Sequence, residues 1–198
     1  MGHSMGGHLG LRYLAEHEGD YNAAVFSAPL LRYHIIPAFK CNGKVLSAPA
    51  FLDKIIFKII KTADTDYIPF GGPWTEERQI KNMPQLTSDS HRHSYLRDAF
   101  LKNPKLQVGS WTALTAKEAF RSCQKLQKET VNTPTLIFMA ENELVIDNDA
   151  IRNFAEKQPN MKLITLEDAL HEIPVERDEI RDVFVSEMRD FFKRHIPN

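Results

Sequence analysis

The chain has 198 residues, of which 42% are hydrophobic and 26% charged, which suits one globular domain with room for an inserted subdomain. Its formal net charge of −1 at pH 7, with no long Lys/Arg run, excludes the basic surface by which proteins bind nucleic acid. No run of about 18 uncharged apolar residues is present, which excludes a membrane-spanning helix.

The two cysteines, Cys41 and Cys123, are far apart and belong to no metal-binding or redox pattern, so we expect ordinary thiols. The first residues lack the basic and apolar segments of a signal peptide. The sequence therefore predicts a cytoplasmic location, and it indicates no oligomeric state.

Residues 1–29 predict a turn, a helix and a strand. Residues 2–6 spell Gly-His-Ser-Met-Gly, the pattern of a nucleophile elbow, in which a strained turn between strand and helix presents a serine, here Ser4. Small residues two positions either side allow that turn, and the backbone N–H of Met5 is placed to donate to an oxyanion. The alternative is a glycine-rich tail without chemistry. A helix pattern follows over 8–17, and the apolar run 23–29 predicts a strand.

Residues 30–130, the middle region, contain both tryptophans and most of the prolines. The sequence predicts helices over 49–64, 88–101 and 115–127, and an irregular segment over 66–74. Apolar side chains dominate one side of residues 51–60 and lysines the other. Three interpretations stay open for that helix: core packing, contact with an acyl chain, or contact with a lipid surface.

Residues 131–198 return to alternating elements. The sequence predicts strands over 133–140 and 161–168 and helices over 148–158 and 181–196. This alternation is typical of a parallel sheet flanked by helices, so the fold class is α/β. The chain then divides into core residues 1–29, an inserted helical middle region 30–130, and core residues 131–198.

A serine nucleophile needs an acid and a histidine, which follow it in that order on such a fold. The loop after strand 133–140 contains Glu141, Glu143 and Asp147, and one of them is expected to orient the histidine. A solvated loop or a helix cap is the alternative for each carboxylate, above all for Asp147. His171 lies in the loop after the next strand, where the general base is expected.

The other histidines fit a catalytic role less well. His3 and His8, in and just after the elbow, are candidates for lining its pocket, whereas His34 and His195 fit no pattern and are expected at the surface. His91 and His93 form a His-x-His pair without a third ligand at a helpful spacing. We therefore expect no metal site, and the chemistry requires no cofactor.

Several stretches of the chain resemble a known family. The segments "GHSMGG", "LTSDSHRH", "NPKLQVGSWT", "TPTLIFMAENELVIDN" and "ALHEIPVERDEIR" are similar to the serine-hydrolase branch of the α/β-hydrolase fold. More narrowly, the chain resembles the bacterial lysophospholipase L2 and monoacylglycerol lipase group. The elbow alone is shared with many lipases and esterases, whereas "LTSD" and "AENELVIDN" are closer to the lysophospholipase members.

The resemblance implies roles for these residues. It implies Ser4 as nucleophile, His171 as general base and Glu143 as the triad acid, at a position where most relatives have aspartate. Glu141 stays the second candidate. The middle region is implied to be a lid over the active site, which agrees with an apolar insertion that has Gly/Pro joints.

The implied function is hydrolysis of carboxylic esters of single-chain lipids, a lysophospholipid or a monoacylglycerol, through an acyl-enzyme. Peripheral contact with the inner membrane accompanies it. The alternatives on the same fold are a short-chain esterase, a thioesterase or a peptidase.

The resemblance also implies parts that this sequence does not contain. The family pattern places several strand–helix units, and a loop with the second oxyanion donor, before the elbow. We therefore expect an N-terminally truncated hydrolase in which the strand at 23–29 lacks its neighbour and activity is low or absent. An inactive fragment acting at most as a binding module is the resulting alternative.

Overall fold

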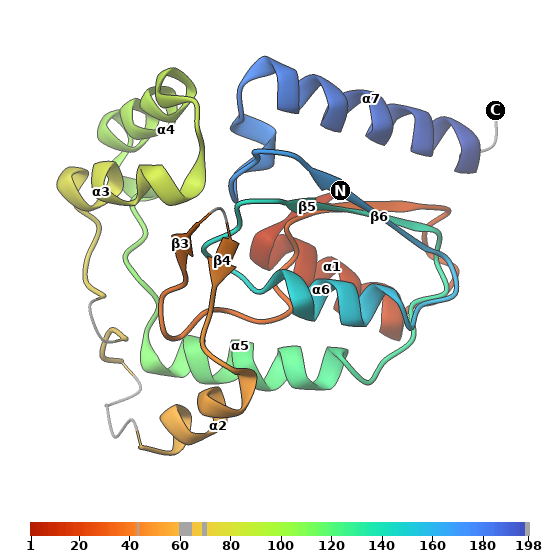
Figure 1. Ribbon diagram of the computed structural model, residues 1–198, viewed down its shortest axis with the longest axis horizontal. Helices are drawn as coiled ribbons and strands as arrows, with labels where there is room; N and C mark the ends of the chain where they lie inside the picture. The colour runs from red at the N-terminus through yellow and green to blue at the C-terminus, as the bar shows by residue number, and fades with distance from the viewer. Residues whose placement is uncertain (43, 60–64, 69–70, 197–198) are drawn as a thin grey trace.

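The computed structural model describes residues 1–42, 44–59, 65–68 and 71–196. At its centre is a four-stranded parallel sheet with the strand order β1-β2-β5-β6 (Figure 1). The strands are β1 (Gly2–His3), β2 (Ala24–Ser27), β5 (Thr135–Ala140) and β6 (Met161–Leu166). The α/β fold predicted from the alternation of strands and helices is confirmed.

Helices cover both faces of this sheet. The helix α7 (Asp178–His195) lies on one face, and α1 (Ser4–Glu16) and α6 (Asn148–Ala155) lie on the other, with α5 (Ala113–Leu126) beyond them (Figure 1). Because both faces are covered, β5 is buried along its whole length and is almost entirely apolar. Phe138 of β5 packs edge-on against Phe184 of α7, with 4.8 Å between the ring centroids.

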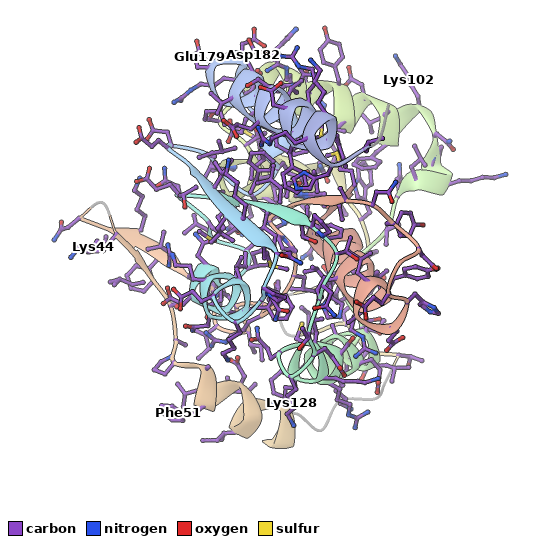
Figure 2. All side chains as sticks on the ribbon, turned by 90° about the vertical axis from the view of Figure 1, so that its right-hand side faces the viewer. Lys44, Phe51, Lys102, Lys128, Glu179 and Asp182 are labelled. Atoms are coloured by element: carbon purple, nitrogen blue, oxygen red, sulfur yellow. The ribbon has the colours of Figure 1, made fainter. Side chains whose placement is uncertain are left out.

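The middle region lies between β2 and β5. Its described elements are the antiparallel hairpin β3 (Phe39–Cys41) and β4 (Lys44–Leu46), the helices α2 (Ala50–Ile59), α3 (Glu76–Leu86) and α4 (Ser90–Lys102), a short 3-10 turn (Pro104–Leu106), and α5. The hairpin projects from the molecule near Lys44, and Phe51 of α2 lies at the outer edge (Figure 2). The helix α5 buries Leu126 completely in the core. The division at residues 30 and 130 stays a prediction.

The observed elements differ from the expected ones in two places. The helix predicted over 49–64 is present as α2 up to Ile59, and residues 60–64 lie outside the described part of the chain. The hairpin and α3 were not predicted. α3 has a proline, Pro84, in its interior, which argues against a helix in sequence, and β3 is only three residues long, all of them exposed.

The expectation that the strand at 23–29 lacks its neighbour is wrong for the second half of β2 only, because β1 pairs with no residue before Phe26. Gly2 and His3 of β1 pair in parallel with Phe26 and Ser27 of β2. The residues just before Ser4 are therefore fixed at the end of a strand.

Candidate active site

Ser4 lies between β1 and the first turn of α1, and its backbone φ is 49°. A non-glycine residue in this left-handed region is strained, and the strain persists only where the surroundings enforce it. The pairing of His3 with Ser27 fixes the chain before the serine, and Leu30 N donates to Ser4 O at 2.9 Å. This is the backbone geometry of a nucleophile elbow.

Only some of the glycines in the elbow are required by close packing. A Cβ added to Gly2 would lie 2.7 Å from Gly6 O, so a side chain does not fit there. Apart from its chain neighbours and the backbone of its own helix, a Cβ added to Gly6 would meet nothing within 4 Å, so no contact with another segment requires this glycine. Gly7 has that role instead, because its added Cβ would lie 2.9 Å from the Cβ of Pro29.

The imidazole of His171 joins the serine to a carboxylate. Its Nε2 lies 3.0 Å from Ser4 Oγ, and its Nδ1 lies 2.8 Å from Glu143 Oε2. With the Nδ1–H donating to the carboxylate, Nε2 accepts the hydroxyl proton of Ser4. The structure thus brings together the three residues that the sequence had singled out at positions 4, 143 and 171.

Glu143 is almost completely buried, with 1% of its surface exposed. Its Oε1 accepts from Val145 N at 2.8 Å and from Ile146 N at 3.2 Å, while its Oε2 accepts from His171. A buried carboxylate destabilises a fold unless donors satisfy it, and these three donors do so. They also fix the direction of the carboxylate.

The other two candidate acids lie elsewhere. Glu141 is exposed, and its Oε2 accepts from Asp168 N at 2.9 Å. Asp147 is the N-cap of α6, where it accepts from Asp149 N at 2.9 Å, and it also pairs with Arg32 at 2.5 Å. The helix-cap interpretation therefore describes Asp147, and Glu143 is the acid that contacts the histidine.

Charges around His171 set its protonation. Burial by itself lowers the pKa of His171, but the charge and hydrogen bond of Glu143 and the charge of Glu172 outweigh it, so the pKa is raised. Burial likewise pushes the pKa of Glu172 up, yet its close contact with His3 and the charges of His3 and His171 bring it below its usual value. The Nε2 of His3 lies 3.3 Å from Glu172 Oε2, and its Nδ1 lies 2.9 Å from Ser27 Oγ. His3 and Glu172 therefore form a second polar pair beside the histidine.

The backbone N–H of Met5 lies in the first turn of α1. The first N–H groups of a helix have no intrahelical acceptor, and the helix dipole makes this end positive. The position of Met5 directly after Ser4 thus suits a donor to a negatively charged oxygen formed at the serine.

The remaining histidines have structural surroundings. His8 is buried, with its Nε2 2.7 Å from Ser122 Oγ, and it is not among the described residues that line the large cavity. The expectation that His34 lies at the surface is wrong, since only 5% of it is exposed. The backbone N of His34 donates to Val145 O at 3.2 Å, so His34 contacts the loop that contains Glu143. Burial lowers the pKa of His34.

The His-x-His pair does not form a metal site in the described structure. His93 is buried, whereas His91 is exposed and has its Nε2 3.1 Å from the hydroxyl of Tyr95. Within the described residues, no group of three or more His, Cys, Asp or Glu side chains is placed to hold a metal. Both cysteines are free thiols, and burial raises the pKa of Cys123 to about 12.

A cavity of about 1040 Å³ lies beside the elbow. It is lined by the segment after β2 and by α2, α3, α5 and α6. Leu30 lines it and also donates its N–H to Ser4 O, so one lining residue contacts the backbone of the nucleophile. Neither Ser4 nor His171 is among the described lining residues. Among its lining residues, Arg32 pairs with Asp53 of α2 at 2.6 Å.

The outer side of α2 is apolar and exposed. Phe51 and Ile55, one turn apart, are 63% and 46% exposed, so core packing does not apply to these two side chains. Ile56 instead lines the cavity. In the described part of the chain, no helix has the length and hydrophobicity needed to cross a membrane.

Comparisons with known proteins identify the family and relatives of the chain. The model of the family described as "Serine aminopeptidase, S33" matches residues 1–178. The chain is 26% identical over 210 residues to lysophospholipase L2 of Escherichia coli K12, covering 98% of this chain and 57% of that protein. It is 25% identical over 183 residues to probable lysophospholipase L2 of Haemophilus influenzae, covering 91% and 55%. The chain thus spans little more than half the length of these relatives.

Solved structures share the fold. A soluble variant of monoglyceride lipase from Saccharomyces cerevisiae superposes with a TM-score of 0.68 at 18% identity, covering 100% of this chain and 61% of that one. A monoacylglycerol lipase from Paleococcus ferrophilus gives 0.65 at 17% identity, covering 98% and 67%. At such low identity the likeness concerns the fold alone.

Proposed function

Because the chain belongs to the family described as "Serine aminopeptidase, S33" and has the α/β-hydrolase fold, we propose that it hydrolyses carboxylic esters of single-chain lipids through Ser4, His171 and Glu143. One observation carries the proposal: the unbroken hydrogen-bonded line from Ser4 Oγ through the imidazole to Glu143 Oε2. That line supplies a nucleophile, a base and an orienting acid in the order that acyl transfer needs.

Acylation begins at Ser4. His171 Nε2 takes the hydroxyl proton while Oγ attacks the ester carbonyl carbon, and the carbonyl oxygen becomes an oxyanion. The N–H of Met5, at the positive end of α1, donates to that oxyanion. His171 then passes its proton to the leaving alcohol oxygen, the C–O bond of the ester breaks, and the acyl group stays on Ser4.

Deacylation reverses the roles of these groups. His171 removes a proton from water as the water oxygen attacks the acyl carbon, and the returned proton restores the Ser4 hydroxyl as the fatty acid leaves. Glu143 remains ionised through both steps. Its hydrogen bond keeps Nδ1 protonated, and its charge stabilises the imidazolium that forms twice in each cycle.

Two observations favour lipid esters as substrates. The relatives named above are a lysophospholipase and, among the solved structures, monoglyceride lipases. The cavity beside the elbow is about 1040 Å³ in volume and its walls include Leu30, Leu31 and Trp111, which suits an acyl chain. We propose a lysophospholipid or a monoacylglycerol as the substrate.

A peripheral contact with a lipid surface accompanies this proposal. Phe51 and Ile55 expose apolar side chains on α2, and the sequence of that helix also contains Lys54 and Lys58. Helices that lie on anionic membranes combine exposed apolar residues with lysines in their sequence.

A peptidase is the second candidate, because the family description names an aminopeptidase. Esters and amides of increasing acyl length distinguish the two. We expect the wild-type chain to hydrolyse p-nitrophenyl esters and lysophosphatidylcholine or monoacylglycerol, with a kcat/KM that rises with acyl length. We expect Ser4→Ala to hydrolyse none of these substrates. Preference for an aminoacyl amide, or for acetyl over long acyl groups, would refute the lipid assignment. A folded chain inactive on every substrate would favour the binding-module alternative.

A further inference from the structure

Glu176 is a buried carboxylate outside the line of Ser4, His171 and Glu143. None of its surface is exposed. Its Oε1 accepts from Leu170 N at 2.8 Å, and both of its oxygens lie 3.2 Å from Ser88 N. The hydroxyl of Ser88 also donates to Oε2. One carboxylate thus joins the residue before His171 to Ser88, which lies two residues before the start of α4.

The donors to this carboxylate are backbone amides and a hydroxyl. The guanidinium of Arg92 contacts the backbone oxygen of Glu176, not its carboxylate, and it also pairs with Asp178. A buried carboxylate is costly to desolvate, so its position depends on donors gathered from both segments. A movement of either segment would leave the Glu176 carboxylate without some of its hydrogen-bond donors.

Two further hydrogen bonds join the same segments. Glu172 N donates to Leu86 O at 2.7 Å, and the hydroxyl of Thr87 donates to Val175 O at 3.0 Å. Thr87 is buried, with 1% exposed. The residues before and after His171 are therefore both held, one by Glu176 and the other by Leu86. Leu86 also lines the large cavity.

We propose that Glu176 is a positioning residue for His171 and that it acts by joining the histidine loop to residues 86–88 of the middle region. This inference rests on the proposed function, in which His171 is the general base. Glu143 holds the ring of His171 through Nδ1, whereas Glu176 and Leu86 O hold the backbone from which that ring extends. A shift of about 1 Å in a catalytic group costs roughly a hundredfold in rate. The rate therefore depends on the position of the loop backbone as well as on the orientation of the imidazole ring.

The test uses Glu176→Gln with Glu179→Gln as its matched control. Both changes replace a carboxylate by an amide of nearly the same shape. Glu179 lies at the outer surface of α7, where its side chain is 79% exposed (Figure 2). In Glu176→Gln, one acceptor oxygen becomes an NH₂ group that cannot accept from Leu170 or Ser88.

We expect Glu176→Gln to lower kcat for a p-nitrophenyl ester by roughly ten- to a hundredfold with KM unchanged, since Glu176 is not among the described residues that line the cavity. Amide hydrogen exchange at Leu170 and Glu172 should speed up by about tenfold or more. Glu179→Gln should match the wild type in all three measurements. Ser88→Ala, which removes only the hydroxyl donor, should change kcat and the exchange rates in the same direction by less, again with KM unchanged.

Wild-type kcat together with wild-type exchange at Leu170 in Glu176→Gln would overturn the positioning role while leaving the proposed function intact. A loss seen only in KM would overturn it too. If the wild-type chain hydrolyses no ester, the proposed function fails, and exchange at Leu170 still decides whether Glu176 holds the loop. If Glu176→Gln does not fold, unchanged kcat and exchange in Ser88→Ala overturn the inference.

Discussion

His171 and Glu143 are 3% and 1% exposed, and a hydrogen bond of 2.8 Å joins Nδ1 of the one to Oε2 of the other. Because the pair is enclosed, water does not compete for the Nδ1 proton, and the carboxylate fixes the tautomer in which Nε2 faces Ser4. The reactivity proposed for Ser4 therefore depends on an acid that lies far from it in sequence.

Alanine replacements distinguish Glu141 from Glu143, the two glutamates of the loop after β5. Glu143→Ala should lower kcat by about a thousandfold or more, because the imidazole loses both its orientation and the charge that stabilises its protonated form. Glu141→Ala should keep nearly full activity, because Glu141 is exposed and contacts Asp168 N rather than His171. Steady-state hydrolysis of a p-nitrophenyl ester measures both. Full activity in Glu143→Ala with loss in Glu141→Ala would reverse the assignment.

The pH profile should respond to Glu172. The base form of His171 is neutral, so activity falls as the pH drops through the pKa of His171, which Glu143 and Glu172 together raise. In Glu172→Gln one of these negative charges is gone, the pKa is lower, and the acid limb of kcat/KM should move to lower pH. The exposed Glu167→Gln is the control and should leave it in place. An acid limb that stays, or moves to higher pH, contradicts the electrostatic account.

Alanine at Gly6 and Gly7 should have opposite effects on stability. Gly6→Ala places a Cβ in open space within a helix and should be neutral or stabilise by up to about 1 kcal/mol. Gly7→Ala brings a Cβ to 2.9 Å from Pro29 Cβ and should destabilise by about 1–3 kcal/mol. Urea unfolding measures the free energy of each variant. Equal values for the two would show that Gly7 is not packed as described.

Sedimentation with anionic vesicles tests the lipid contact of α2. The wild-type chain should sediment with the vesicles, less so at high salt, and Phe51→Asp or Ile55→Asp should reduce the bound fraction several-fold. Tyr95→Asp is the control, since Tyr95 is as exposed as Phe51 but lies on α4. Binding that neither salt nor the α2 substitutions change would contradict the proposal.

The sequence predicted the parts of the fold that have a local pattern. β5 is a continuous apolar run, β6 and α7 follow it with recognisable periods, and their alternation with helices indicated a parallel sheet. The motif around Ser4 and the loops containing Glu143 and His171 were found because each follows a predicted strand. α3 was missed because Pro84 lies in its interior, and a proline there argues against a helix in sequence.

What the sequence could not supply is the set of contacts between distant segments. His34 was expected at the surface because nothing nearby in sequence shows that its backbone pairs with Val145. Glu176 looks like one of several carboxylates in a charged stretch, and its contacts with Leu170 and Ser88 appear only in the folded chain. The choice of Glu143 over Glu141 rested on resemblance alone until the structure brought Glu143 to the histidine.

Labelling of Ser4 by a fluorophosphonate probe measures its activation by His171, because only a serine activated by a neighbouring base reacts rapidly with the probe. We expect covalent modification of the folded wild-type chain, mapped by peptide mass to Ser4, with little or none in Ser4→Ala and His171→Ala. Absence of labelling in the folded wild-type chain, or unchanged labelling in Ser4→Ala, would contradict this activation of Ser4.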